Sequence, residues 1–384
     1  MTRWKTVILC FLGWILVFCP VTVKAEDSEN WLTPQQQESL WEASGAQGLT
    51  ELLPQDAQNI LEKSGLEDMD TDEILQIDPK GFLSGVWNSI WDSLTAPLKM
   101  FGVLTGVVLL AALMKNLSQG LGDKSVSGIY QLISVLCVSG MIVTPLLEAI
   151  RQTTARIEQV NDFLLGFIPV YTGIISVSGK PLSAFTYHSL LLGAVEIMGT
   201  GVQTILVPLI GVYLAVCLTG AVSGGMPMGG VAKTVKTAAT WILGLLMTLF
   251  VGLLTIKGIL AGAADSVTLR AGKYLAGAFI PLIGNAVGDA LTVVQGSVGV
   301  IRSTIGVVGI LGVTACFLPS ILQLGLLGLA VRGAQGVGEL LETSEVSSVL
   351  DAAGFVVSFL QTVMILYALM VLISISLMLV LGGG

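Results

Sequence analysis

Charged side chains are scarce in this 384-residue chain, at 11% of residues against about 25% in soluble globular domains. Hydrophobic residues make up 53% of the chain, and the mean hydropathy is +0.85. This shortage of charge excludes a soluble enzyme, and the net charge of −8 excludes a protein that binds nucleic-acid phosphates. With one histidine and five cysteines, we expect no metal, no cofactor and no catalysis. What remains is an all-α polytopic membrane protein.

The acidic residues concentrate near the N-terminus. Residues 26–99 hold 15 acidic and 3 basic side chains, whereas residues 100–384 hold 11 acidic and 12 basic side chains. An acidic region is therefore joined to a nearly neutral, apolar body. We expect two parts, an exported acidic region over 26–97 and a membrane body over 98–384.

The first 25 residues have the pattern of a secretory signal peptide. Arg3 and Lys5 precede an apolar run of 13 residues over 7–19, which is short for a membrane crossing. Small side chains at Val23 and Ala25 predict cleavage after Ala25. An uncleaved first helix is the alternative. Either way, the acidic region should face away from the cytoplasm, in a multi-pass protein of the cell membrane.

The region 26–97 should be small and helical, and too poor in apolar runs for a core of its own. A helix is expected over 57–64. The segment 79–97 is amphipathic and carries Trp87 and Trp91 on one side. Tryptophans before a span favour the lipid headgroup region. Packing on the exported region is the alternative.

The body reads as a glycine-rich bundle of apolar helices, with six to nine crossings. Clear apolar segments cover 97–114, 126–147, 202–222, 237–256, 304–331 and 354–381. Weaker segments, which could be tilted spans, half-helices or re-entrant hairpins, cover 163–178, 182–199 and 274–293. Glycines four residues apart predict close helix packing, within a bundle or between copies of a homo-oligomer. These pairs are Gly102/Gly106, Gly220/Gly224, Gly258/Gly262 and Gly284/Gly288.

An internal repeat is one interpretation of a recurring tetrapeptide. Phe167-Ile-Pro169-Val170 recurs 112 residues later as Phe279-Ile-Pro281-Leu282. The same offset relates residues 126–222 to 238–334. Short segments interrupted by proline in two matching halves point to a transporter-like centre. Chance similarity between apolar segments is the alternative.

Few ionisable groups fall inside the apolar segments, where charge is costly and often functional. Glu196 and His188 lie eight residues apart, so both could face one side of a helix and relay protons or ions. Interfacial placement or a structural pair is the alternative. The candidate functional residues are His188, Glu196 and Asp289, with Pro169, Pro281, Gly284 and Gly288.

One stretch resembles a known family. The run Arg270-Ala-Gly-Lys273-Tyr-Leu-Ala-Gly-Ala-Phe-Ile-Pro281-Leu-Ile-Gly284-Asn-Ala-Val-Gly288-Asp289-Ala resembles stage III sporulation protein AE. The order of parts is similar too: a signal peptide, a short acidic exported region, a glycine-rich multispan body and a long terminal span.

The resemblance implies a subunit of a transenvelope channel or secretion apparatus in the mother-cell membrane around the forespore, needed for late forespore gene expression. Implied partners are other stage III sporulation A proteins and, indirectly, stage II sporulation protein Q. Two alternatives stay open, a stand-alone permease for a small solute and a non-transporting assembly scaffold. The sequence contains no ATP-binding motif.

Overall fold

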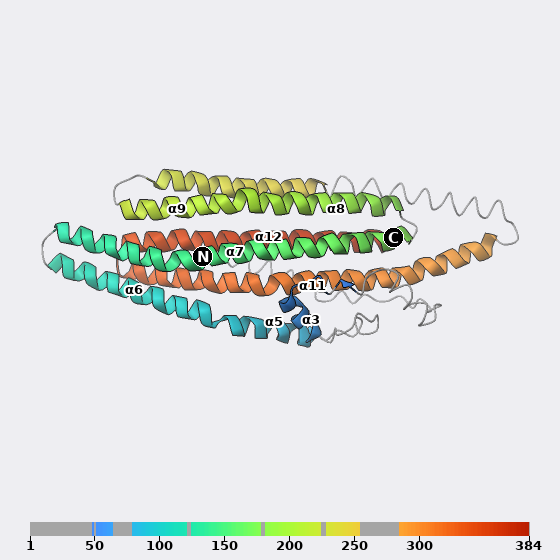
Figure 1. The fold of residues 1–384 in the computed structure, drawn as a ribbon, viewed down its shortest axis with the longest axis horizontal. Helices are drawn as coiled ribbons and strands as arrows, with labels where there is room; N and C mark the ends of the chain where they lie inside the picture. Colours follow the sequence, from blue (N-terminus) through green and yellow to red (C-terminus); the bar gives the residue numbers. More distant parts are fainter. Residues whose placement is uncertain are drawn as a thin grey trace.

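The computed structural model describes seven stretches of the chain, and all of their regular structure is helical. These stretches cover residues 48–49, 51–63, 79–120, 124–177, 181–223, 228–253 and 284–383. The helices run back and forth along one axis and form an elongated bundle (Figure 1). The predicted all-α fold is confirmed, whereas the signal peptide over 1–25 lies outside the described residues.

The helices all run along the bundle axis, and Figure 1 colours them from blue to red in chain order. They are α3 (Gln55–Glu62), α5 (Pro79–Ser93), α6 (Thr95–Gly120), α7 (Lys124–Val177), α8 (Pro181–Gly201), the π-helical turn η2 (Val202–Leu206), α9 (Val207–Ser223), the helix Gly229–Leu253, α11 (Gly284–Leu340) and α12 (Ser344–Gly383).

Helices α11 and α12 form the centre of the bundle, since their apolar stretches are more than half buried. A tight turn joins them. Glu342 adopts a left-handed φ of 54°, its amide donates to the Glu339 carbonyl, and the Thr343 amide donates to the Gly338 carbonyl at 2.9 Å. This pair of hydrogen bonds is the Schellman motif that ends a helix and reverses the chain. Small residues then let the two helices approach, as where Gly328 faces Val357.

Helix α7 changes the interpretation of the first weak segment. It runs without interruption for 54 residues, about 80 Å at 1.5 Å per residue, and contains both Pro145 and Pro169. The clear segment 126–147 and the weak segment 163–178 are its two ends. The prediction of a separate span or hairpin at 163–178 is therefore wrong, because the polar stretch between the two segments is itself helical.

The second weak segment, 182–199, also continues a clear one. Helix α8 passes through the single π-turn η2 into α9, so residues 181–223 form one long rod. The third weak segment, 274–293, lies outside the described residues up to residue 283, and its remainder opens α11.

Six helices in the described part of the chain are long and apolar enough to cross a membrane. Large apolar side chains are exposed on the first two of them, and this is expected of a surface that faces lipid. Examples are Leu98, Leu110, Leu113, Leu117, Ile129, Ile133 and Leu136. On the helix Gly229–Leu253, the hydroxyls of Thr234, Thr237, Thr240 and Thr248 each donate to the carbonyl four residues earlier. These four threonine hydroxyls thus have hydrogen-bond acceptors without water.

Helix α5 combines the two expectations for the segment 79–97. Trp87 and Trp91 are both about 60% exposed and stack with ring centroids 5.9 Å apart. On its other side Val86 is buried, and Gly85 lies against Ile60 of α3. The helix therefore packs on α3 and also presents a tryptophan pair outward.

Of the glycines that spacing predicted, Gly220 is crowded, because a Cβ there would lie 2.9 Å from Met228. Gly102 and Gly106 have open space where a side chain would begin, so the expected close packing is not found there within the described chain. On α11, a Cβ at Gly309 would lie 2.6 Å from Phe167, and one at Gly312 would lie 3.0 Å from Leu53. The close contacts bring α11 against α7 and the N-terminal region.

The repeat stays a prediction. Helix α7 and the helix Gly229–Leu253, which begin the two supposed halves, run in the same direction along the bundle (Figure 1). Helices α9 and α11 both run in the opposite direction. Matching directions fit a parallel duplication better than an inverted one, but Pro281 lies outside the described residues.

Candidate functional site

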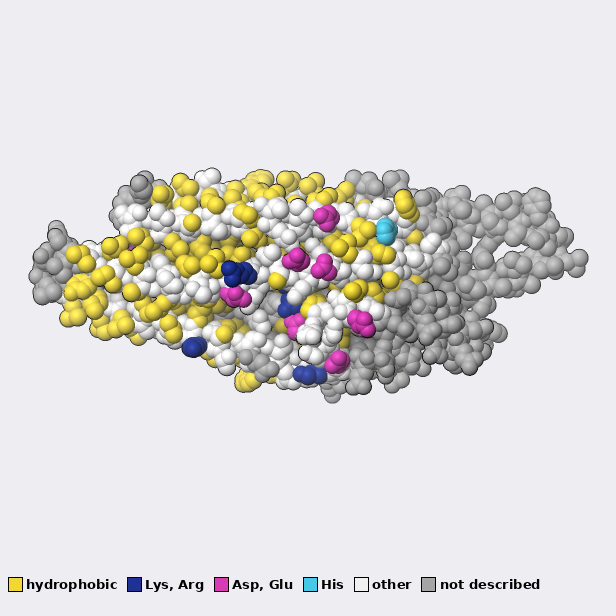
Figure 2. All heavy atoms as spheres, viewed as in Figure 1, with side chains coloured by type: hydrophobic (Ala, Val, Ile, Leu, Met, Phe, Trp, Pro, Cys, Tyr) yellow, Lys and Arg dark blue, Asp and Glu magenta, His cyan; other side chains and the backbone are white. Residues whose placement is uncertain are grey.

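The middle of α7 carries a row of charged side chains on the surface. Glu148, Arg151, Glu158 and Asp162 are all exposed, and their spacing of three, seven and four residues places them along one side of the helix. We call these four residues the polar patch. Figure 2 shows charged side chains gathered over the middle of the bundle, next to a largely apolar surface. A continuous helix with apolar ends thus has a polar centre.

An ion pair ties helix α3 to α7 beside the polar patch. The two terminal guanidinium nitrogens of Arg156, Nη1 and Nη2, donate to the carboxylate of Asp56 at 3.1 and 2.7 Å. Arg156 is 18% exposed and Asp56 42% exposed, so water screens the pair. Such pairs contribute about 1 kcal/mol or less. Two parallel hydrogen bonds nevertheless fix the direction and register of α3.

Apolar contacts provide most of the attachment of α3. Leu49, Leu53, Ala57, Ile60 and Leu61 are each no more than 3% exposed. The N-terminal region therefore completes the bundle core. The region 26–97 was expected to lack a core of its own, and its described apolar residues pack into the core of the bundle instead.

The bundle interior below the polar patch is filled by aromatic side chains. Phe163, Phe167 and Tyr171 stack in succession along α7, with centroids 5.4 and 5.5 Å apart. The Tyr367 hydroxyl of α12 donates to the side-chain oxygen of Asn161. The hydrogen bond joins α7 to α12 at the level of the polar patch.

His188 binds α7. Its Nδ1 atom lies 3.2 Å from the Thr172 hydroxyl oxygen. That hydroxyl also donates to the Ile168 carbonyl of its own helix at 2.8 Å. This contact secures α8 beside Pro169, which is exposed within the continuous α7.

Glu196 is exposed on α8, and its carboxylate accepts a hydrogen bond from the Thr200 hydroxyl at 3.5 Å on the same helix. Eight residues separate it from His188, about 12 Å along the helix. The structure does not bring these two candidate residues together. Gly284, Gly288 and Asp289 lie in the first turns of α11, whose side-chain surroundings are outside the description.

Sequence reasoning missed the polar patch and the α3 anchor. One signal could have found the patch, because apolar residues recur at helical spacing through the polar stretch. Ala149, Ile157 and Val160 are all buried, and their spacing predicts one continuous helix with a solvent-exposed polar face. No comparable signal pairs Asp56 with Arg156, which are 100 residues apart.

In the described part of the chain, no group of three or more His, Cys, Asp or Glu side chains could hold a metal ion. The three cysteines with described surroundings are free thiols: Cys137, Cys217 and Cys316.

Comparisons with known proteins give the family. A family model described as stage III sporulation protein AE matches residues 63–382 and so begins directly after α3. The curated stage III sporulation protein AE of Bacillus subtilis (strain 168) is 23% identical over 232 residues. That alignment covers 60% of this chain and 58% of the relative. No solved structure matches the chain. With most of its length inside the family match, this multi-pass membrane protein belongs to the stage III sporulation protein AE family.

Proposed function

We propose that this chain is a non-enzymatic membrane subunit of the transenvelope apparatus that links mother cell and forespore during endospore formation, and that it docks its partners through the polar patch. Family membership supports the role in sporulation. The polar patch carries the docking assignment, because a row of exposed charges on a rigid helix gives a partner a complementary surface. The partners we propose are other stage III sporulation A proteins.

The position of α3 supports an orientation for the polar patch. We propose that α3 is exported, because it follows a signal-like N-terminus. Its ion pair with Arg156 then places the middle of α7 within reach of the exported compartment. The patch would face the space between the mother-cell membrane and the forespore. The proteins that connect the two membranes would meet it there.

The packing of the bundle favours a subunit over a lone permease. Large side chains that are almost fully buried fill the described interior, among them Phe163, Phe167, Tyr171, Phe317 and Tyr367. A lone permease must hold its solute between its own helices. In a subunit, by contrast, the passage can run between copies or between partners. We therefore propose that any transport uses the assembled apparatus.

Reversing the charge of the polar patch tests this function. The double variant Glu158→Lys/Asp162→Lys should reduce copurification of other stage III sporulation A proteins from sporulating cells by tenfold or more. Both side chains are exposed, so the amount of membrane-inserted protein should not change. The control Glu339→Lys/Glu342→Lys makes the same charge change at the α11–α12 turn and should copurify normally.

Two results would contradict the docking assignment. One is unchanged copurification in the patch variant at equal protein level. The other is an equal loss in the control variant, because net charge rather than the patch would then explain the effect. Solute uptake into liposomes by the purified chain alone would favour the permease alternative.

Orientation has its own test, in a variant whose native cysteines are replaced. Glu62→Cys in α3 should react with a membrane-impermeant maleimide in intact protoplasts, because Glu62 is exposed on the helix we propose to be exported. Glu339→Cys, exposed at the other end of the bundle, should react only after permeabilisation. The mature chain should begin at Glu26 on N-terminal sequencing. The opposite labelling pattern would reverse the orientation.

Glu196→Gln separates an ionic role from a structural one. Because Glu196 is exposed and its hydrogen bond joins it to Thr200 on its own helix, the substitution should leave the protein level unchanged. If Glu196 serves ion transport, spore formation should fall at least a hundredfold in the heat-resistance assay. A normal spore count would remove Glu196 from the candidate residues.

A further inference from the structure

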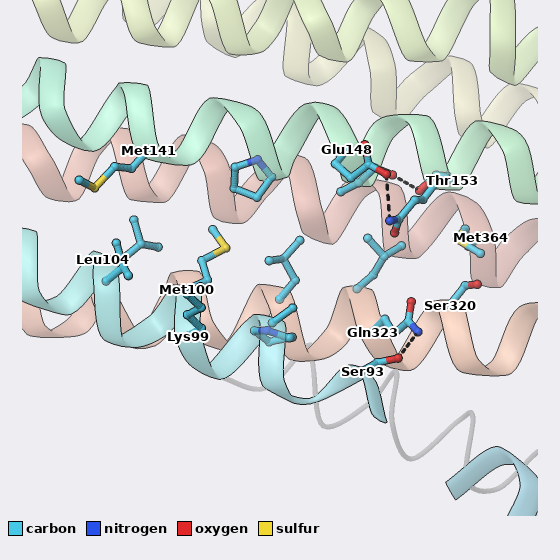
Figure 3. Close-up of a pocket in the computed structure, with 18 residues that line it drawn as sticks. Ser93, Lys99, Met100, Leu104, Met141, Glu148, Thr153, Ser320, Gln323 and Met364 are labelled. Atoms are coloured by element: carbon cyan, nitrogen blue, oxygen red, sulfur yellow. Dashed lines mark hydrogen bonds between the residues drawn. The ribbon is translucent and has the colours of Figure 1, made fainter. Parts of the chain in front are cut away.

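A surface cleft of about 660 Å³ lies where α5 meets α6, bounded on its other sides by α7, α11 and α12 (Figure 3). Its volume is in the range that accommodates a small molecule or a lipid chain. Its walls include three methionines, Met100, Met141 and Met364. Their flexible side chains adapt to an irregular apolar occupant.

Polarity changes along the cleft. At one end, the apolar side chains of Leu104 and Met141 face each other (Figure 3). At the other end, the Gln323 amide donates to the Ser93 hydroxyl at 2.7 Å, and Ser320 lies nearby. An occupant that fits this cleft is apolar at one end and polar at the other.

The tryptophan pair on α5 relates this gradient to the membrane. Exposed, stacked Trp87 and Trp91 favour the headgroup region, and Ser93 ends the same helix. Helix α6 then begins at Thr95 with a stretch apolar enough to span the bilayer. The polar end of the cleft thus lies on the headgroup side, and its apolar end extends along α6 into the hydrocarbon.

Charges at the cleft match a phospholipid. Lys99 and Glu148 line it and are both exposed, and the Gln152 amide donates to the Glu148 carboxylate at 3.1 Å. A lysine beside an apolar channel is suited to a phosphate on an acyl chain. Val103 lines the cleft and is exposed, as expected where the cleft opens toward lipid.

We propose that this cleft is a phospholipid site, with one acyl chain between α6 and α7 and the phosphate at Lys99. The bound lipid would fill the space between the α5–α6 junction and the central helices, and so hold the exported helices at a fixed depth. This goes beyond the proposed function, because it assigns a ligand of the membrane that is distinct from the partner proteins.

A photoactivatable phospholipid with a diazirine in its acyl chain tests the site in purified full-length protein reconstituted in vesicles. The probe should label peptides from 96–104 and 141–153. Met141→Trp should reduce this labelling at least fivefold, because Met141 lines the cleft and its exposed side chain tolerates enlargement. Leu136→Trp on the same helix is the control, since Leu136 is exposed but does not line the cleft.

Lys99→Gln gives a second readout that does not enlarge any side chain. It should abolish the rise in Tm that added phospholipid gives delipidated protein, because a ligand bound to the folded state stabilises it. Equal labelling of the Met141→Trp and Leu136→Trp variants would overturn the proposal. So would crosslinking of a photoreactive residue at position 103 to a partner helix in sporulating cells. Neither test measures copurification through the polar patch, so this proposal and the proposed function can fail separately.

Discussion

Replacing Leu53 with aspartate should detach the N-terminal region and abolish spore formation. Leu53 is 3% exposed and lies against Gly312 of α11. A buried, unpaired carboxylate costs several kcal/mol, and the milder Leu53→Ala change should still cost about 2–5 kcal/mol. We expect a fall in Tm of at least 5 °C for the aspartate variant in detergent, together with a large loss of heat-resistant spores.

Asn59→Asp is the matched control for this variant. It adds the same charge to α3 at an exposed position, so its Tm and spore count should stay close to those of the unmodified protein. If Leu53→Asp were as stable as the control, the N-terminal region would not be part of the core. Because of the same contacts, deleting residues 27–78 should destabilise the bundle as well as weaken partner binding.

Gly309→Leu should have the second large effect. A Cβ at Gly309 would lie 2.6 Å from the ring of Phe167, which is buried in the stacked aromatic row of α7. The added side chain must push α11 and α7 apart at a level where both are packed. Overpacking of this kind costs about 1–3 kcal/mol or more. We expect little folded protein in the membrane fraction and no spores.

The control for that change is Gly102→Leu in α6. Nothing lies within 4 Å of the position where its Cβ would be, so leucine should be accepted and the folded fraction should remain. Size-exclusion chromatography with a fluorescent tag would measure both variants. Equal yields would show that the α7–α11 contact is looser than described.

The sequence was sufficient to predict the helical fold, because long apolar runs leave few other structures in a membrane. Its six clear apolar segments, out of six to nine expected crossings, largely coincide with the six described helices that are long and apolar enough to span one. It also predicted a helix over 57–64, close to α3 at Gln55–Glu62. Apolar runs are local features, so composition and periodicity reveal them. The exposed tryptophans of α5 were predicted for the same reason.

Features that depend on distant contacts could not be predicted. Glycine spacing favoured Gly102 and Gly106, which have open space, and did not indicate Gly309 and Gly312, which are crowded, because crowding depends on which helix lies opposite. The sequence analysis divided α7 into two segments because its centre is polar, although the buried Ile157 and Val160 continue the helical pattern through that centre. The eight-residue spacing of His188 and Glu196 did not reveal that His188 contacts α7.

In-cell crosslinking tests the central claim most directly. A photoreactive benzoylphenylalanine at position 158 or 162 in the polar patch should form an adduct with another stage III sporulation A protein in sporulating cells. The same residue at position 132, where Leu132 is exposed on the apolar part of α7, should form none. A contradictory result would be a membrane-inserted protein that gives no adduct from 158 or 162, or gives the same adducts from all three positions.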